Sequence, residues 1–239
     1  MSIDKLKELI KQSQSIVLFG GAGTSTESNI PDFRSENGLY ALKLQDTSPE
    51  EILSHDYFYK HPDRFYAFLK TYLLVPDIKP HKGHYATVHL EAEGLSAIIT
   101  QNIDGLHQAA GSKNVIELHG SLHRHYCTKC HALYAMDWII ENQNPVIRCP
   151  LCNGLVKPDV VLYGEPLDQD IMARAVKAIQ SADLLIVVGT SLVVYPAASF
   201  LRYFKGHNLV LINKTQTPYD SNANLVIRES YGEVFSQLV

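Results

Sequence analysis

The chain has 239 residues, of which 46% are hydrophobic, and its formal net charge at pH 7 is -4. That length is enough for one large domain or for a domain with a smaller lobe. The slightly acidic balance argues against general binding of nucleic acid or of an anionic membrane. No apolar run approaches the roughly 20 residues of a membrane span.

Residues 1–13 are charged and carry apolar side chains at helical spacing. This pattern predicts an amphipathic helix and not a signal peptide. We therefore expect a cytoplasmic protein, and disulfides are rare in that compartment. The four cysteines need another explanation.

The most informative stretch is residues 19–34, which follow a short apolar run that predicts a strand. The stretch begins with a glycine-rich turn, and hydroxyl side chains directly after it are typical helix caps. A strand, a glycine turn and a helix start gather backbone N–H groups in a way that suits a phosphate. Thr26 stands where the strict dinucleotide motif has its third glycine, so an ordinary strand-to-helix connection is the alternative.

Residues 35–82 have helical character and are rich in aromatic side chains. We expect a packed helical lobe, with a few of these side chains lining a pocket for an apolar substrate. Apolar strands and helices then alternate along the chain. The expected strands are 95–100, 115–118, 160–162, 184–188, 209–212 and 225–227, and the expected helices are 85–93, 168–181, 196–204 and one at the C-terminus.

This alternation predicts an α/β fold with a parallel sheet covered on both faces. Ligands bind such sheets at the carboxyl ends of the strands. Polar signatures recur at five expected strand ends: after Phe19, after Thr100, at His119, after Val188 and after Ile212. We expect these ends to form one crevice.

His119 ends an expected strand and shares the crevice with Asn102 and Asp104. Histidine can accept a proton near neutral pH, so His119 is a candidate general base. A purely structural role for this histidine is the alternative.

The four cysteines form two C-x2-C pairs separated by residues 131–148. This spacing is typical of a tetrahedral zinc site, and four thiolates leave no open position, so the zinc should be structural. A redox pair or four unrelated cysteines are the alternatives. The proposed ligands are Cys127, Cys130, Cys149 and Cys152.

Taken together, these motifs resemble one family, the sirtuins, which are NAD-dependent protein lysine deacylases. The resemblance covers nearly the whole chain and includes Gly-Ala-Gly-Thr-Ser at 21–25, Ile-Pro-Asp-Phe-Arg at 30–34, Gln-Asn-Ile-Asp at 101–104, His-Gly at 119–120, the two cysteine pairs, Gly-Glu at 164–165, Gly-Thr-Ser-Leu at 189–192 and Ile-Asn at 212–213.

The resemblance implies a Rossmann-type, doubly wound large domain made of residues 1–34, 83–120 and 157–239. It implies a small lobe made of a helical insertion, 35–82, and a zinc-ribbon module, 121–156. NAD and an acetylated lysine of a protein or peptide would meet between them. The acyl oxygen would attack the nicotinamide ribose, releasing nicotinamide, deacetylated lysine and O-acetyl-ADP-ribose.

By the same resemblance, His119 and Asn102 are the catalytic residues, with His119 as the general base. The implied NAD contacts are Ala22, Thr26, Phe33, Arg34, Gln101, Ile103, Asp104, His119, Thr190, Ser191, Asn213 and Tyr231. The substrate peptide would pair as a strand between residues 160–165 and 192–194.

The sequence departs from the family pattern at three places. Asn29 replaces a glycine, although asparagine tolerates a left-handed backbone. Lys157 replaces a common arginine. Leu69 stands three residues after Tyr66, where family members that prefer succinyl-lysine carry arginine, so we expect uncharged acyl groups.

Several other functions use the same residues. An ADP-ribosyltransferase would employ the same NAD site, and a non-catalytic NAD sensor would not need both His119 and Asn102. A dehydrogenase is disfavoured because no separate substrate domain follows the NAD-binding pattern. A zinc-dependent nucleic-acid binder is disfavoured by the acidic net charge.

Overall fold

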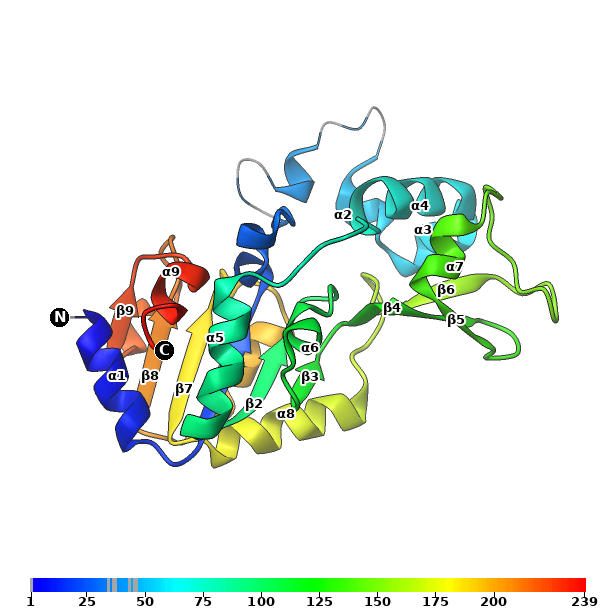
Figure 1. Ribbon diagram of the computed structural model, residues 1–239. Helices are drawn as coiled ribbons and strands as arrows, with labels where there is room; N and C mark the ends of the chain where they lie inside the picture. Colours follow the sequence, from blue (N-terminus) through cyan, green and yellow to red (C-terminus); the bar gives the residue numbers. More distant parts are fainter. Residues whose placement is uncertain (1, 34, 36–37, 43, 45–46) are drawn as a thin grey trace.

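The computed structural model describes residues 2–33, 35, 38–42, 44 and 47–239. The larger part of the molecule is built on a six-stranded sheet with strand order β3-β2-β1-β7-β8-β9 (Figure 1). All neighbouring strands in this sheet are parallel. The strands are β1 (Ile16–Gly20), β2 (Leu95–Thr100), β3 (Val115–Glu117), β7 (Leu184–Val188), β8 (Asn208–Ile212) and β9 (Leu225–Ile227).

The chain progresses outward from β1 in both directions, so the strand order reverses between β1 and β7. This is the doubly wound order, and its ligand crevice lies outside the carboxyl ends of the strands at the reversal. The predicted fold class is therefore confirmed, and the crevice is expected beside Gly20 and Val188.

Helices cover both faces of this sheet. Each strand contributes to the cores on both sides, because its successive side chains point to opposite faces. Ile16 and Leu18 of β1 belong to a core shared with α1, α5 and α9, whereas Val17 and Phe19 belong to a core shared with α8 and η6. These helices span Ser2–Gln12 (α1), Lys82–Leu90 (α5), Gln169–Ser181 (α8), Tyr231–Phe235 (α9) and, as a 3-10 helix, Ala197–Tyr203 (η6).

The smaller part combines a helical segment with a three-stranded antiparallel sheet of order β5-β4-β6 (Figure 1). Serine side chains cap two of its helices, since Ser48 accepts from Glu51 N–H and Ser54 accepts from Tyr57 N–H. Its elements are α2 (Pro49–Ile52), α3 (His55–Lys60), α4 (Pro62–Phe68), the π-helical turn η4 (Leu69–Leu73), β4 (Gly120–Cys127), β5 (Leu133–Ala135), α7 (Met136–Glu141) and β6 (Val156–Val160).

The helical segment and the antiparallel sheet share one hydrophobic core. Phe58, Phe65 and Tyr66 pack in it with Ile147 and Val156. The predicted packed helical lobe is confirmed, and its apolar face is buried against the sheet that carries the cysteines. The remaining helices are α6 (Leu106–Ala110) and the short 3-10 turns Ala22–Thr24 (η1), Thr26–Ser28 (η2), Leu39–Ala41 (η3), Glu91–Glu93 (η5) and Asp220–Asn222 (η7).

The structure corrects three sequence predictions. The glycine turn leads into two 3-10 turns and not into an α-helix; the hydroxyls of Thr24 and Thr26 donate to the carbonyls of Gly21 and Gly23. Asn29, at φ 63°, then reverses the chain in the left-handed conformation that asparagine tolerates.

The strand expected at 160–162 lies instead at Val156–Val160 and pairs antiparallel with β4. This pairing makes it part of the smaller sheet, and the sequence analysis missed it because β4 was not predicted. Residues 196–204 form a 3-10 helix, η6, in place of the expected α-helix.

Among the described residues, no helix is long and apolar enough to cross a membrane.

Candidate functional site

The glycine turn lies where the strand order reverses. Gly21 N–H donates to Val188 O at 3.1 Å and Gly23 N–H donates to Gly189 O at 2.8 Å, so the loops after β1 and β7 touch. A Cβ on Gly23 would lie 2.7 Å from Gly189 Cα, closer than atoms can pack. Glycine is required here because two backbones meet, as in a nucleotide-binding turn.

A cavity of about 820 Å³ opens beside this turn. Its volume lies in the usual range of small-molecule and cofactor sites. Residues from all five expected strand ends line it, so the predicted single crevice is present. The predicted residues at its wall are Ala22, Thr26, Phe33, Gln101, Asn102, Ile103, Asp104, His119, Thr190, Ser191, Asn213 and Tyr231. Arg34 lies outside the described residues.

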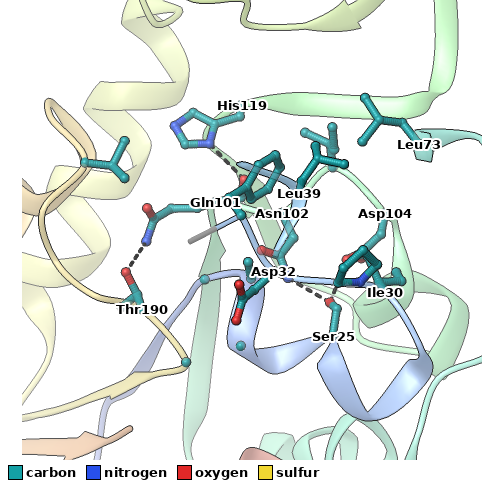
Figure 2. A pocket seen from close by; sticks show the side chains of 18 of the residues that line it. Ser25, Ile30, Asp32, Leu39, Leu73, Gln101, Asn102, Asp104, His119 and Thr190 are labelled. Atoms are coloured by element: carbon teal, nitrogen blue, oxygen red, sulfur yellow. Dashed lines mark hydrogen bonds between the residues drawn. The ribbon is translucent and has the colours of Figure 1, made fainter. Parts of the chain in front are cut away.

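His119 lies in this cavity after β3 (Figure 2). Its Nδ1–H donates to the carbonyl of Gln101 at 2.8 Å, because a carbonyl can only accept. Burial lowers the pKa of His119, and the bond to Gln101 opposes that shift only in part. The ring is therefore neutral at pH 7, and its Nε2 lone pair can accept a proton.

A chain of polar side chains forms the floor of the site. Asn102 Nδ2 donates to Ser25 Oγ at 2.8 Å and to Thr24 Oγ1 at 3.0 Å, and Ser25 Oγ donates to Asp104 Oδ2 at 2.6 Å (Figure 2). Burial raises the pKa of Asp104, whereas hydrogen bonds from Ser25 and the Leu106 N–H lower it. The network fixes the amide of Asn102 and the carboxylate of Asp104 toward the cavity.

Ser25 is a functional candidate that was not among the predicted site residues, although it belongs to the motif at 21–25. It is 1% exposed and connects the glycine turn to the loop after β2. Its sequence position inside the glycine stretch was the only available signal, because its partners lie more than 70 residues away.

The opposite wall joins β2 to β7. Gln101 Nε2 donates to Thr190 Oγ1 at 3.1 Å (Figure 2), and the Leu192 N–H donates to the same hydroxyl at 3.3 Å. Asn213 lies further along, with its amide held by Thr215. Tyr231 is 2% exposed and its hydroxyl is hydrogen-bonded to Thr87. Its ring is therefore part of the packing behind the cavity wall.

An apolar arm of the cavity extends between the helical segment and the smaller sheet. Tyr66 does not line this arm; its hydroxyl donates to the carbonyl of Val156 within the core of the small lobe. Among the described residues that line the cavity, Lys214 is the only lysine or arginine. The arm is lined by Phe65, Leu69, Leu73, Ile103, Leu122 and Met136.

The four cysteines converge at the far end of the smaller sheet. Their Sγ atoms all lie within 4.8 Å of one another, and all four are free thiols. Four sulfurs about 2.3 Å from one Zn²⁺ would be roughly 3.8 Å apart, so the arrangement fits a tetrahedral thiolate site.

The two cysteine pairs have the same local geometry. His131 N–H donates to Cys127 O at 3.0 Å and Asn153 N–H donates to Cys149 O at 2.9 Å. Both His131 and Asn153 have φ 59°. Each turn therefore directs two thiolates to one point, which fits one structural zinc ion and disfavours a redox pair.

The fold and the cavity define a doubly wound nucleotide-binding protein whose small lobe contains a four-cysteine metal site. Comparison with known proteins adds the family. The Sir2 family matches residues 21–196. The chain is 54% identical over 239 residues to the NAD-dependent protein deacetylase of Clostridium acetobutylicum, covering 99% of this chain and 98% of the other. It is 55% identical over 240 residues to the enzyme of the same name from Clostridium perfringens, covering 99% and 98%.

Solved structures agree with this assignment. A Sir2 protein with a deacetylated p53 peptide and 3′-O-acetyl ADP-ribose superposes with a TM-score of 0.92 at 38% identity, covering 100% of this chain and 97% of that one. A Sir2 protein bound to acetylated peptide gives a TM-score of 0.86 at 37% identity, with 100% and 97% coverage. This chain belongs to the Sir2 family, the sirtuins.

Proposed function

We propose that this protein removes acetyl groups from lysine side chains of proteins, with NAD as co-substrate. The observation that carries the proposal is His119, a buried imidazole that lines the nucleotide cavity, with a lowered pKa, Nδ1 bonded to Gln101 and no described residue bonded to Nε2. A base in that state suits removal of a proton from a ribose hydroxyl.

When bound, NAD supplies a ribose carbon from which nicotinamide can leave and to which the acetyl oxygen can bond. The residues around it bind and orient. Asp104 and the Ile103 backbone are suited to hold the nicotinamide amide, because the carboxylate accepts hydrogen bonds. Asn102 is suited to position the ribose or a water, since Ser25 and Thr24 fix its amide.

The phosphates of NAD would lie at the glycine turn, near Ala22 and Thr26, where backbone N–H groups meet at the strand reversal. Thr190, Ser191 and Asn213 line the part of the cavity that would receive the ribose and adenine. Phe33 would cover the nicotinamide end. These roles follow the resemblance to the sirtuins and stay predictions for each residue.

The substrate peptide has a suitable edge beside His119. Val161 N–H donates to the His119 carbonyl, and Tyr163 pairs through N–H and C=O with Leu53 and His55. Among the described residues, no hydrogen bond uses the N–H or C=O of the next residue, Gly164. We infer that Gly164 offers the main-chain groups to which an extended peptide adds.

We also propose the division into a large domain (1–34, 83–120 and 157–239) and a small lobe (35–82 and 121–156). The core shared by the helical segment and the thiolate sheet supports the small lobe, and β6 (Val156–Val160), which pairs in the smaller sheet, crosses the proposed boundary at residue 157. A cytoplasmic location stays a proposal, supported by four cysteines that are free and not paired in disulfides.

The proposal is tested by incubating the protein with an acetyl-lysine peptide, with and without NAD, and analysing the products by mass spectrometry. We expect the peptide to lose its acetyl group only when NAD is present. Nicotinamide and O-acetyl-ADP-ribose should form in amounts equal to the acetyl groups lost. Gain of ADP-ribose on a protein without loss of acetyl would identify the alternative, an ADP-ribosyltransferase.

The acyl preference is tested with acetyl-lysine and succinyl-lysine versions of one peptide. Leu69 lines the apolar arm and no cation lies there among the described residues, so a carboxylate would be desolvated without a partner. We expect acetyl-lysine to be cleaved with the higher kcat/KM. Equal values for the two peptides would contradict this assignment.

A further inference from the structure

Two tyrosines from distant parts of the chain meet at the mouth of the cavity. Tyr40 lies in η3 and Tyr163 follows β6, 123 residues later. Their hydroxyl groups are hydrogen-bonded to each other. Both side chains line the cavity, and we call them the tyrosine pair.

Tyr40 is attached to the segment that would cover the nicotinamide. Its N–H donates to Phe33 O at 2.9 Å, and its ring lies 5.4 Å from the Phe33 ring between centroids. The Leu39 N–H donates to Asp32 O at 2.7 Å. A shift of Phe33 therefore also moves Tyr40, because both main chain and rings connect them.

Tyr163 is attached to the edge that would bind the peptide. Its N–H donates to Leu53 O at 3.0 Å and its carbonyl accepts from His55 N–H at 2.9 Å. Gly164, which offers the free main-chain groups, is its direct neighbour and has φ 89°. The position of the Tyr163 backbone therefore sets the position of the peptide-pairing groups.

We propose that the tyrosine pair couples the binding of NAD to the binding of the acyl-lysine peptide. The inference rests on the proposed deacetylase function. The pair is a positioning contact and touches neither reacting group. The contact between the two hydroxyls is already formed, and each ligand would act on one of the two tyrosines, so a shift that the first ligand causes in one tyrosine is passed to the other. Because such coupling is reciprocal, the effect is the same whichever ligand binds first.

The coupling is measured as the ratio of two NAD dissociation constants, without and with saturating acetyl-lysine peptide. An NAD analogue with carbon in place of the ribose ring oxygen prevents turnover, and calorimetry gives the constants. We expect the wild type to bind the analogue more tightly with peptide, and Tyr40→Phe and Tyr163→Phe each to reduce the ratio about fivefold, the usual worth of one hydrogen bond.

The double variant Tyr40→Phe/Tyr163→Phe should lose less than the sum of the two single variants, since both changes remove the contact between the two hydroxyls. Tyr203→Phe is the matched control, because Tyr203 is 44% exposed against 41% for Tyr163 and lies outside the cavity. It should keep the wild-type ratio. Melting temperatures close to wild type for all variants would separate coupling from a general loss of structure.

Three results would overturn the proposal: a wild-type ratio of one, an unchanged ratio in the single variants, or additive losses in the double variant. The deacetylation assay on the same preparation keeps the two proposals apart. No NAD-dependent loss of acetyl in the wild type would refute the deacetylase function. Normal deacetylation with an unchanged ratio would refute only the coupling.

Discussion

His119 is suited to act as a base because of two local facts. The Gln101 carbonyl fixes the proton on Nδ1, and burial disfavours the charged ring. The first fact leaves Nε2 as the nitrogen with the lone pair, and the second keeps the ring unprotonated at pH 7, although a lowered pKa makes the imidazole a weaker base. The sequence identified this histidine, but the tautomer depends on a carbonyl 18 residues away.

Replacing His119 by alanine should lower kcat at least about 100-fold while NAD binding and folding persist, the pattern expected for a lost general base. Steady-state kinetics, NAD calorimetry and a melting curve measure the three properties. His207→Ala, on an exposed loop, is a control that should keep wild-type kinetics. A variant with normal kcat would exclude His119 as the base.

The pH profile gives an independent check of the same residue. The active base is the neutral ring, and the pKa of His119 is lowered from its ordinary value of 6.5. Activity should therefore persist as pH falls to 6.5 and decline only below it. A measured kcat/KM profile whose acid limb lies above pH 6.5 would contradict a base with a lowered pKa.

At the scale of elements, Lys157 fixes the segment that carries the peptide edge. Its side chain is 4% exposed, and Nζ lies 2.9 Å from Glu165 Oε2 and donates to Val160 O at 2.7 Å. Glu165 Oε2 also accepts from Leu162 N–H at 2.9 Å. One cation thus holds both ends of residues 160–165, a role that the sequence did not reveal.

Lys157→Met should lower the free energy of unfolding by about 3 kcal/mol, because it leaves the Glu165 carboxylate without its cation. It should also raise the KM for peptide more than the KM for NAD, whereas Lys157→Arg should keep both near wild type. Urea unfolding and steady-state kinetics are the measurements.

Lys60→Met is the matched control, since Lys60 pairs with Asp56 at 3.9 Å on the surface and such a pair contributes at most about 1 kcal/mol. A Lys157→Met protein with wild-type stability and wild-type peptide KM would show that the ion pair is dispensable.

At the scale of the whole molecule, a buried histidine cluster connects helices α5, α6 and α9 beneath the glycine turn. His81 Nε2–H donates to Thr24 O at 2.8 Å, and the rings of His84 and His107 lie 4.9 Å apart beside Tyr231. Burial and the neighbouring histidines lower the pKa of His84 to about 2 and that of His107 to about 4.

Acid should therefore destabilise the protein over a defined range of pH. The unfolded chain binds protons at both histidines below about pH 6.5, and the folded protein binds them only near pH 4 or lower. The free energy of unfolding should fall as pH decreases from 6.5 to 4, by up to about 1.4 kcal/mol per pH unit for each histidine.

Urea unfolding at a series of pH values measures this slope. His107→Gln should reduce it by about one proton, whereas His89→Gln, at an exposed position of α5, should leave it unchanged. An unchanged slope in His107→Gln would mean that this histidine does not stay neutral in the folded protein.

The thiolate site ties the small lobe together, because Cys127 and Cys149 belong to the same core as Phe58, Phe65 and Tyr66. Removing zinc with a chelator should unfold residues 121–156 and abolish deacetylation, and added zinc should restore both. Proteolysis followed by mass spectrometry locates the unfolded segment. Full turnover in protein shown to be zinc-free would refute a structural need for the metal.

The sequence by itself determined the features that depend on neighbours in the chain. Glycine, hydroxyl and asparagine residues specify turns locally, a pair of cysteines two residues apart specifies a knuckle, and apolar runs specify strands. The six strands of the parallel sheet and the thiolate quartet were predicted on that basis. The predicted strand at 160–162 was displaced because pairing with β4 is non-local.

Only the tertiary structure decided the contacts between residues far apart in sequence. The tautomer of His119, the link from Asn102 through Ser25 to Asp104 and the tyrosine pair are of this kind. Each joins loops that follow different strands, and their meeting depends on the strand order of the sheet. No periodicity or spacing encodes that order, so the sequence located the site and the fold determined its geometry.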